Sequence, residues 1–207
     1  MSRNLYIGLG GSGIKTIDEI KQQLVNARRE DSSIATVFCA IDTDRHSLHS
    51  CTSLLSNELE LVNICGELHA RERYLVYRNE YGIPQNNVER LQALHNFGSG
   101  QIRSNGHFCF LCNKDKLRDM ILFAYHKLTN IELNIESFNI NVHLFFSLCG
   151  GTGSGIFYDV AKLVKELIPN SNIACYTYSH HYFPSSASWN NIESNTYATF
   201  LELEACF

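Results

Sequence analysis

Apolar residues in this chain form short runs that alternate with longer stretches of helical spacing. The run from Ile140 to Leu148 is rich in large apolar residues, as a strand buried on both faces is. In the stretch that follows, Phe157, Val160 and Val164 recur at the spacing of one helical face. The pattern predicts strands at 4–8, 35–41, 106–112, 141–148 and 172–178, and helices at 13–29, 68–81, 86–95, 114–129, 154–168 and 190–206.

The alternation of predicted strands and helices defines the expected fold class. Apolar strands that alternate with helices favour an α/β, Rossmann-like, mostly parallel sheet with helices on both faces. The chain has 207 residues and no linker-like tract, so residues 1–207 are expected to form one domain. Residues 45–66 have the least regular pattern, and we expect them to pass around the edge of the sheet.

A glycine-rich loop lies between the fourth predicted strand and the helix after it. Cys149 is followed by the sequence GGTGSG, whose members are Gly150, Gly151, Thr152, Gly153, Ser154 and Gly155. Backbone N–H groups and the helix dipole favour an anion at such a position, which predicts a phosphate site. The motif GxxxxGK[ST] is absent from the chain, which argues against a P-loop NTPase.

A second glycine loop follows the first predicted strand. Its sequence, GLGGSG, ends with Gly10, Gly11, Ser12 and Gly13 and has the spacing G-x-G-x-x-G, and the next strand ends at Asp42. Taken alone, this unit resembles a dinucleotide-binding β-α-β unit with an acid for the ribose. The spacing from Gly13 to Asp42 exceeds the roughly 20 residues expected of that unit.

With both loops in view, the chain resembles the tubulin/FtsZ superfamily of GTP-binding proteins from residue 5 to 207. The loop at 8–13 is similar to the family's opening GxGGxG, and GGTGSG to its GGGTGTG signature. Residues 42–44 resemble the loop that reads NTD in FtsZ, with Asp42 in place of asparagine, and residues 97–101 lie where the family has a third glycine loop. Residues 98–103 and 194–203 look closest to the large bacterial tubulin-like proteins.

The resemblance implies a ligand, a metal and partners. It implies GTP or GDP with Mg²⁺, and self-association or association with other tubulin-like subunits. The phosphates would lie over both glycine loops, near Gly98, Ser99 and Gly100 of the third loop. Asp42 and Asp44 would help to hold Mg²⁺, with Asp44 as the metal ligand. A Cβ at Gly151 or Gly153 is expected to block the close approach of phosphate.

Two residues of the last predicted helix resemble the family's sugar and base contacts. These are Glu193 and Asn195. The carboxylate of Glu193 also has a purely structural interpretation, because the dipole of a helix favours an acid at its N-terminus.

Hydrolysis is left open by the sequence. In the family, an acidic loop beyond the nucleotide-binding domain activates the attacking water in a neighbouring subunit. The printed chain ends at Phe207 within an amphipathic pattern, and no such loop is present in it. We therefore expect a nucleotide-binding domain without the family's C-terminal domain, either truncated or no longer hydrolytic. No catalytic residue is assigned, and slow hydrolysis is expected.

Composition narrows the partners and alternatives. The net charge of −4 gives no basic footprint for nucleic acid or anionic lipid, and no apolar run reaches the length of a membrane span. Eight cysteines without a disulfide-like or zinc-like framework, and no signal peptide, favour reduced thiols and the cytoplasm. Two other functions stay open: an NAD(P)-binding Rossmann oxidoreductase, and a degenerate interaction module that binds no nucleotide.

Overall fold

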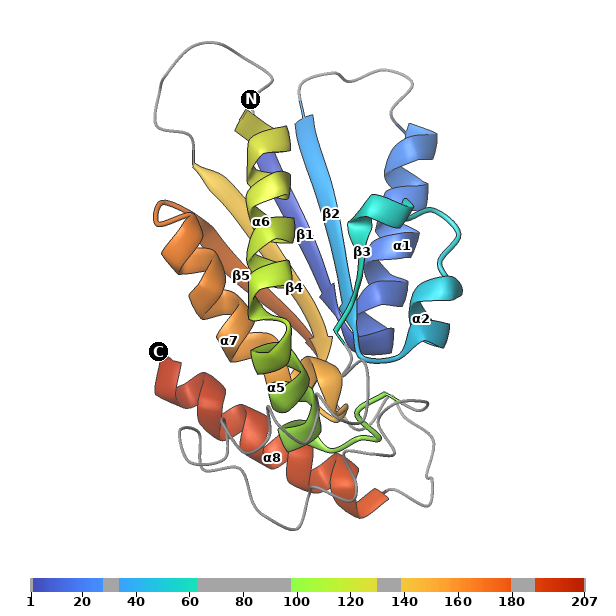
Figure 1. The fold of residues 1–207 in the computed structure, drawn as a ribbon, viewed down its shortest axis with the longest axis vertical. Helices are drawn as coiled ribbons and strands as arrows, with labels where there is room; N and C mark the ends of the chain where they lie inside the picture. Colours follow the sequence, from blue (N-terminus) through green and yellow to red (C-terminus); the bar gives the residue numbers. More distant parts are fainter. Residues whose placement is uncertain (1, 28–33, 63–97, 130–138, 180–188, 207) are drawn as a thin grey trace.

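The fold is a five-stranded parallel sheet in the order β3-β2-β1-β4-β5 (Figure 1). The computed structural model describes residues 2–27, 34–62, 98–129, 139–179 and 189–206. The strands are β1 (Ser2–Leu9), β2 (Ile34–Asp42), β3 (Leu59–Leu61), β4 (Ile140–Ser147) and β5 (Asn172–Tyr178). The helices are α1 (Gly10–Ala27), α2 (Arg45–His49), α5 (Arg103–Cys112), α6 (Lys114–Thr129), α7 (Thr152–Leu167) and α8 (Trp189–Cys206), and η1 (Ser56–Glu58) is a short 3₁₀ helix.

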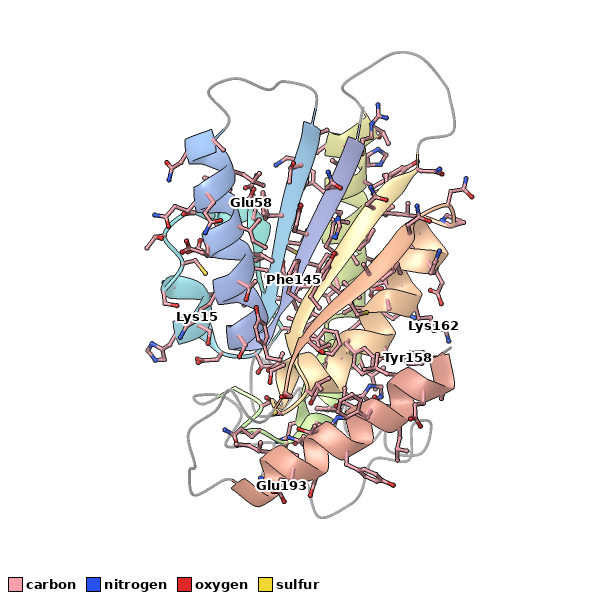
Figure 2. The ribbon with its side chains drawn as sticks, turned by 180° about the vertical axis from the view of Figure 1, so that it is seen from behind. Lys15, Glu58, Phe145, Tyr158, Lys162 and Glu193 are labelled. Atoms are coloured by element: carbon pink, nitrogen blue, oxygen red, sulfur yellow. The ribbon has the colours of Figure 1, made fainter. Side chains whose placement is uncertain are left out.

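Each face of the sheet is covered by helices that bury an apolar stripe. Ile7 of β1 belongs to a core with Ile121 of α6 and Val160 of α7, which cover one face. On the opposite face, Ile17 of α1 packs with Phe145 of β4, and Figure 2 shows α1 in front of the strands there. The prediction of an α/β Rossmann-like parallel sheet with helices on both faces is confirmed.

The predicted strand at 106–112 is wrong, because these residues belong to helix α5. A short apolar run does not distinguish a buried strand from a buried helix. Gly106 allows α5 to lie directly against the glycine loop, since a Cβ there would be 2.3 Å from the Gly151 carbonyl oxygen. Gly106, Phe108 and Phe110 are all buried, so this apolar run is that of a helix packed in the core.

The observed boundaries of several other helices and strands differ from the predicted ones. Helix α1 begins at Gly10 rather than at residue 13, and α7 begins at Thr152 rather than at 154. Part of each glycine loop is therefore the first turn of a helix. The edge strand β3 lies inside the segment 45–66, which was expected only to pass the sheet edge. The helices predicted at 68–81 and 86–95 lie outside the described residues.

The parallel arrangement brings several loops to one edge of the sheet. The segments that follow β1, β2 and β4 all leave from the carboxyl ends of adjacent strands. Helix α8 crosses beneath this edge and packs against α7 (Figure 1). Ligands of open parallel sheets bind at such an edge. Across the ranges that the structure describes, no helix is both long and apolar enough to cross a bilayer.

We predict that Gly106→Ala lowers the free energy of unfolding by about 1–3 kcal/mol, the usual cost of overpacking. Alanine favours a helix over glycine by about 1 kcal/mol, but its Cβ would collide with a backbone carbonyl oxygen that cannot swing away. Urea unfolding measures the change, with the exposed Lys116→Ala on α6 as control. A stability equal to or above that of the unsubstituted protein would contradict the packing described here.

Candidate functional site

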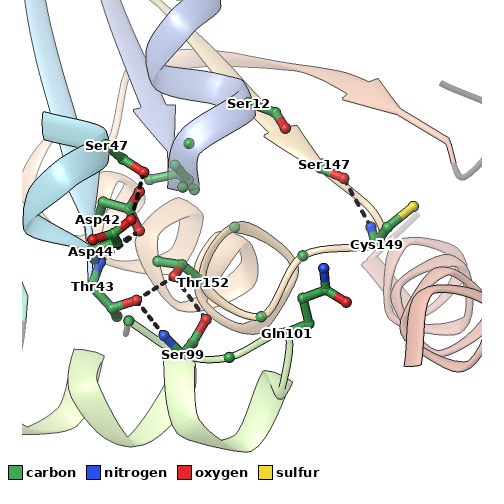
Figure 3. Close-up of a pocket in the computed structure, with 18 of the residues that line it drawn as sticks. Ser12, Asp42, Thr43, Asp44, Ser47, Ser99, Gln101, Ser147, Cys149 and Thr152 are labelled. Atoms are coloured by element: carbon green, nitrogen blue, oxygen red, sulfur yellow. Dashed lines mark hydrogen bonds between the residues drawn. The ribbon is translucent and has the colours of Figure 1, made fainter. Parts of the chain in front are cut away.

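A pocket of about 360 Å³ lies at the carboxyl edge of the sheet (Figure 3). Four loops and one residue of α8 enclose it, and its volume is within the usual range of ligand sites. The lining residues are Leu9, Gly10, Gly11, Ser12, Asp42, Thr43, Asp44, Ser47, Gly98, Ser99, Gly100, Gln101, Ser147, Cys149, Gly150, Gly151, Thr152, Gly153 and Ile192.

Two helix N-termini open into this pocket. Helix α1 begins at Gly10 and helix α7 at Thr152, and both residues line the cavity. The first N–H groups of a helix have no partner within the helix, and the helix dipole adds partial positive charge there. The two glycine loops also abut, because a Cβ at Gly10 would lie 3.1 Å from the backbone nitrogen of Gly153. The arrangement can therefore surround an anion with backbone donors from two sides.

Three hydroxyl groups from three loops meet on one wall of the pocket. Thr152 Oγ1 lies 2.6 Å from Thr43 Oγ1 and 3.0 Å from Ser99 Oγ. The backbone N–H of Ser99 donates to Thr43 Oγ1 at 2.8 Å. All three residues are buried, so these hydrogen bonds are shielded from water and hold the loops in one arrangement (Figure 3).

The two carboxylates of the pocket organise the loop after β2. Asp42 is 3% exposed, and its Oδ1 accepts from the N–H groups of Thr43 and Asp44 at 2.7 and 3.3 Å. Burial raises the pKa of Asp42, although these hydrogen bonds act in the opposite direction. Asp44 caps α2, because Oδ1 accepts from His46 N at 2.9 Å and Oδ2 from Ser47 Oγ at 3.2 Å.

The charged side chains of the pocket are acidic rather than basic. Asp42 and Asp44 contribute two carboxyl groups, and no lysine, arginine or histidine is among the described residues that line the cavity. An anion must therefore be held by backbone N–H groups and hydroxyls, and a cation that arrives with it would offset the carboxylates.

The glycines of the fourth loop, which follows β4 and contains the sequence GGTGSG, have different roles. A Cβ at Gly151 would lie 2.4 Å from Ser99 Oγ, and a Cβ at Gly153 would lie 2.7 Å from the Leu9 carbonyl oxygen. Both residues thus allow contact between loops of the protein rather than leaving room for a ligand. A Cβ at Gly150 would meet no protein atom within 4 Å, so Gly150 is the glycine here whose missing side chain leaves space.

Most of the predicted site residues line the pocket, and five lie behind or beside it. Gly13, Ser154 and Gly155 support the loops: Gly13 packs against the Phe145 carbonyl, Ser154 Oγ donates to the Gly150 carbonyl oxygen, and Gly155 packs against Arg103. Glu193 is exposed on α8 and Asn195 is buried on the same helix, and neither lines the cavity.

Sequence reasoning did not assign Leu9, Thr43, Ser47, Ser147 or Cys149 to the site, and it placed Gln101 in the third glycine loop without counting it among the binding residues. Thr43 stands between the two predicted acids, and Ser47 is three residues after Asp44, so both had a local signal. Ile192 of α8 also lines the pocket. Its position depends on how α8 crosses the sheet edge, which no local pattern of residues gives.

Comparison with known proteins gives the family. The family model described as "Tubulin like" matches residues 5–206. A comparison with curated protein sequences finds no match.

Solved structures share the fold at low sequence identity. CetZ from Methanosaeta thermophila has a TM-score of 0.64 and 17% identity over 99% of this chain and 43% of its own. An FtsZ mutant from M. jannaschii has a TM-score of 0.57 and 15% identity, covering 99% of this chain and 44% of its own. TubZ from Bacillus thuringiensis serovar israelensis, in a GTPγS-form protofilament, has a TM-score of 0.56 and 13% identity. The match covers 98% of this chain and 41% of the TubZ chain.

This chain thus spans less than half the length of each of these relatives. The family match covers nearly all of it, and the parallel sheet is that of the nucleotide-binding domain of tubulin and FtsZ. The chain belongs to the tubulin-like family, within the tubulin/FtsZ superfamily.

Proposed function

We propose that this domain binds a guanine nucleotide, GTP or GDP, in the pocket at the carboxyl edge of the sheet. The observation that carries the proposal is the convergence of two helix N-termini, α1 at Gly10 and α7 at Thr152, on one cavity. A helix N-terminus with a glycine loop is an anion-binding site, and two of them on one cavity offer donors to more than one phosphate group. The choice of guanine over adenine rests on the family, not on the geometry of the pocket.

The phosphates would be held by backbone amides of both glycine loops. Gly10, Gly11 and Ser12 would offer one set of N–H groups, and Gly150, Gly151 and Thr152 would offer another. The hydroxyls of Ser99 and Thr152 add short donors that need no charge. Binding would require these hydroxyls to exchange their mutual hydrogen bonds for bonds to phosphate oxygens.

Magnesium fits the donor set on the loop that follows β2. Asp44 lines the pocket beside the hydroxyls of Thr43 and Ser47, and hard oxygen ligands of this kind suit Mg²⁺. The described residues contain no cluster of three or more acidic, histidine or cysteine side chains that would hold a metal alone. Mg²⁺ would therefore take its remaining ligands from phosphate and water and would neutralise charge between them and Asp44.

Assembly and a sugar contact are further proposals by relation to the family. The TubZ relative is described in a GTPγS-form protofilament, which supports self-association of this chain or its association with tubulin-like subunits. Glu193, exposed at the start of α8, is retained as a candidate sugar contact.

One prediction for nucleotide binding follows from the expectation that the phosphates lie against the Gly150 peptide. Gly150→Ala should weaken GTP binding about tenfold, equivalent to about 1.4 kcal/mol, because the new methyl group would occupy ligand space. Its effect on thermal stability should be small, since the added Cβ meets no protein atom within 4 Å. Calorimetric titration with GTP, GDP, ATP and NAD measures both the affinity and the choice of nucleotide.

The exposed Lys162→Ala on α7, outside the pocket, is the control and should bind like the unsubstituted protein. Unchanged GTP affinity in Gly150→Ala would show that the phosphates do not lie against this loop. Preference for NAD would favour an oxidoreductase, and failure to bind any of the four nucleotides would favour an interaction module.

A separate prediction concerns the role of Asp44 in holding Mg²⁺. Asp44→Asn keeps an oxygen that can cap α2 but removes the charge, so it should weaken GTP binding several-fold in Mg²⁺ and little in EDTA. Titrations under both conditions measure the difference, with the exposed Asp115→Asn on α6 as a charge-matched control. The same loss with and without Mg²⁺ would mean that Asp44 serves only the α2 cap.

A further inference from the structure

Asn195 lies on α8 outside the pocket, yet its amide group contacts two of the loops that form it. Asn195 Nδ2 donates to the carbonyl oxygens of Gln101 and Cys149, each at 2.9 Å, and to that of Gly150 at 3.4 Å. The residue is 8% exposed. An amide nitrogen has two hydrogens, so these three acceptors use all the donor capacity of the side chain.

The bond to the Cys149 carbonyl determines the direction of the next N–H group. A trans peptide unit is planar, and its N–H points away from its C=O. No cis peptide occurs among the described residues. When the Cys149 carbonyl is held toward α8, the N–H of Gly150 in the same peptide unit points away from α8. Both Cys149 and Gly150 line the pocket, so an N–H of this peptide that points away from α8 can serve as a donor to a ligand in the cavity.

The bond to Gln101 stabilises a strained turn in the third loop. Gln101 has a φ of +59°, the only positive φ of a non-glycine residue in the described part of the chain. A residue with a Cβ adopts this conformation at a cost that the surroundings must offset. Asn195 supplies a hydrogen bond to the Gln101 carbonyl, so one side chain fixes the third and fourth loops relative to each other.

Neighbouring contacts hold Asn195 itself in place. Thr199 Oγ1 donates to the carbonyl oxygens of Asn195 and Leu148 at 2.7 and 3.2 Å. Thr196 Oγ1 lies 3.2 Å from Cys149 Sγ. The first half of α8 is therefore bound to the segment 148–150 by buried polar groups, and the Asn195 amide is a rigid support rather than a mobile surface side chain.

We propose that Asn195 is a positioning residue for the phosphate cradle, acting through the carbonyl groups of Cys149 and Gln101 and not through the nucleoside. The inference rests on the proposed function, because it assumes that the pocket holds phosphates. It replaces the expected base or sugar contact at this residue with a role in orienting backbone donors.

The test compares a ligand that has a nucleoside with one that lacks it. GTP with Mg²⁺ and inorganic tripolyphosphate with Mg²⁺ are titrated into the protein and into Asn195→Asp. The carboxylate has the same shape as the amide but would face three carbonyl oxygens, so affinity for both probes should fall by the same factor, about tenfold or more. Asn191→Asp, exposed on the same helix, adds the same charge and should leave both affinities unchanged.

A second variant distinguishes the loss of the Asn195 donors from misfolding caused by the added charge. Asn195→Ala removes the donors without adding a charge, and it should show the same equal loss for the two probes, with thermal unfolding checking that each variant is folded. A loss for GTP alone would overturn the inference in favour of a nucleoside contact. Unchanged affinity for both probes would overturn it as well.

An amide spectrum separates this inference from the proposed function. In the nucleotide-free protein, the ¹H–¹⁵N resonance of Gly150 should shift in both Asn195 variants and stay in place in Asn191→Asp. If the unsubstituted protein binds neither probe, the proposed function fails, and the resonances alone decide whether Asn195 orients the loop. An unmoved Gly150 resonance would then overturn that role.

Discussion

Direct contact between backbones at the carboxyl ends of β1 and β4 is the constraint on which the site depends. A Cβ at Gly13 would lie 2.0 Å from the Phe145 carbonyl oxygen, and a Cβ at Gly153 would lie 2.7 Å from the Leu9 carbonyl oxygen. The start of α1 thus lies against β4, and the start of α7 lies against β1. No residue with a side chain permits this approach. Because both helices begin so close to the sheet, their N-termini face the same cavity.

The electrostatics of the pocket follow from this arrangement. The N–H groups of two helix starts supply partial positive charge, whereas Asp42 and Asp44 supply carboxyl groups. Burial of Asp42 disfavours its ionised form, and the N–H groups of the same loop partly compensate. A phosphate in this site would interact with dipoles rather than with a lysine, so the balance of charge there depends on the cation that accompanies it.

Apolar and polar contacts have different roles in this structure. The cores on the two faces of the sheet, centred on residues such as Ile7 and Ile17, hold the helices against the strands. Such packing is not directional and does not orient individual peptide groups. The hydrogen bonds of Thr43, Thr152 and Asn195 supply that orientation, because each fixes a loop at a defined atom. Apolar packing therefore holds the helices on the sheet, and hydrogen bonds orient the loops of the site.

The local pattern of the sequence determined the strand–loop–helix units and the position of the glycine loops. Runs of apolar residues around Ile7 and Leu144 indicated buried strands, and the GGTGSG sequence indicated an anion site, because both signals are carried by neighbours in the chain. Pattern also placed the two glycine loops and Asp42 at the pocket, since loops after parallel strands share one edge of the sheet, whereas Asp44 and the residues at 98–100 came from the resemblance to the family.

Only the tertiary structure decided the features that depend on distant partners. The segment 106–112 belongs to a helix in which Gly106 packs against Gly151, a contact that its own apolar run could not indicate. The amide of Asn195 turns to carbonyl groups that are 45 to 94 residues away in the chain. Spacing along a helix gives a residue's face but not what lies opposite that face. The sequence therefore identified the pocket, whereas contacts between α5, α7 and α8 decided which side chains enter it and which hold it in shape.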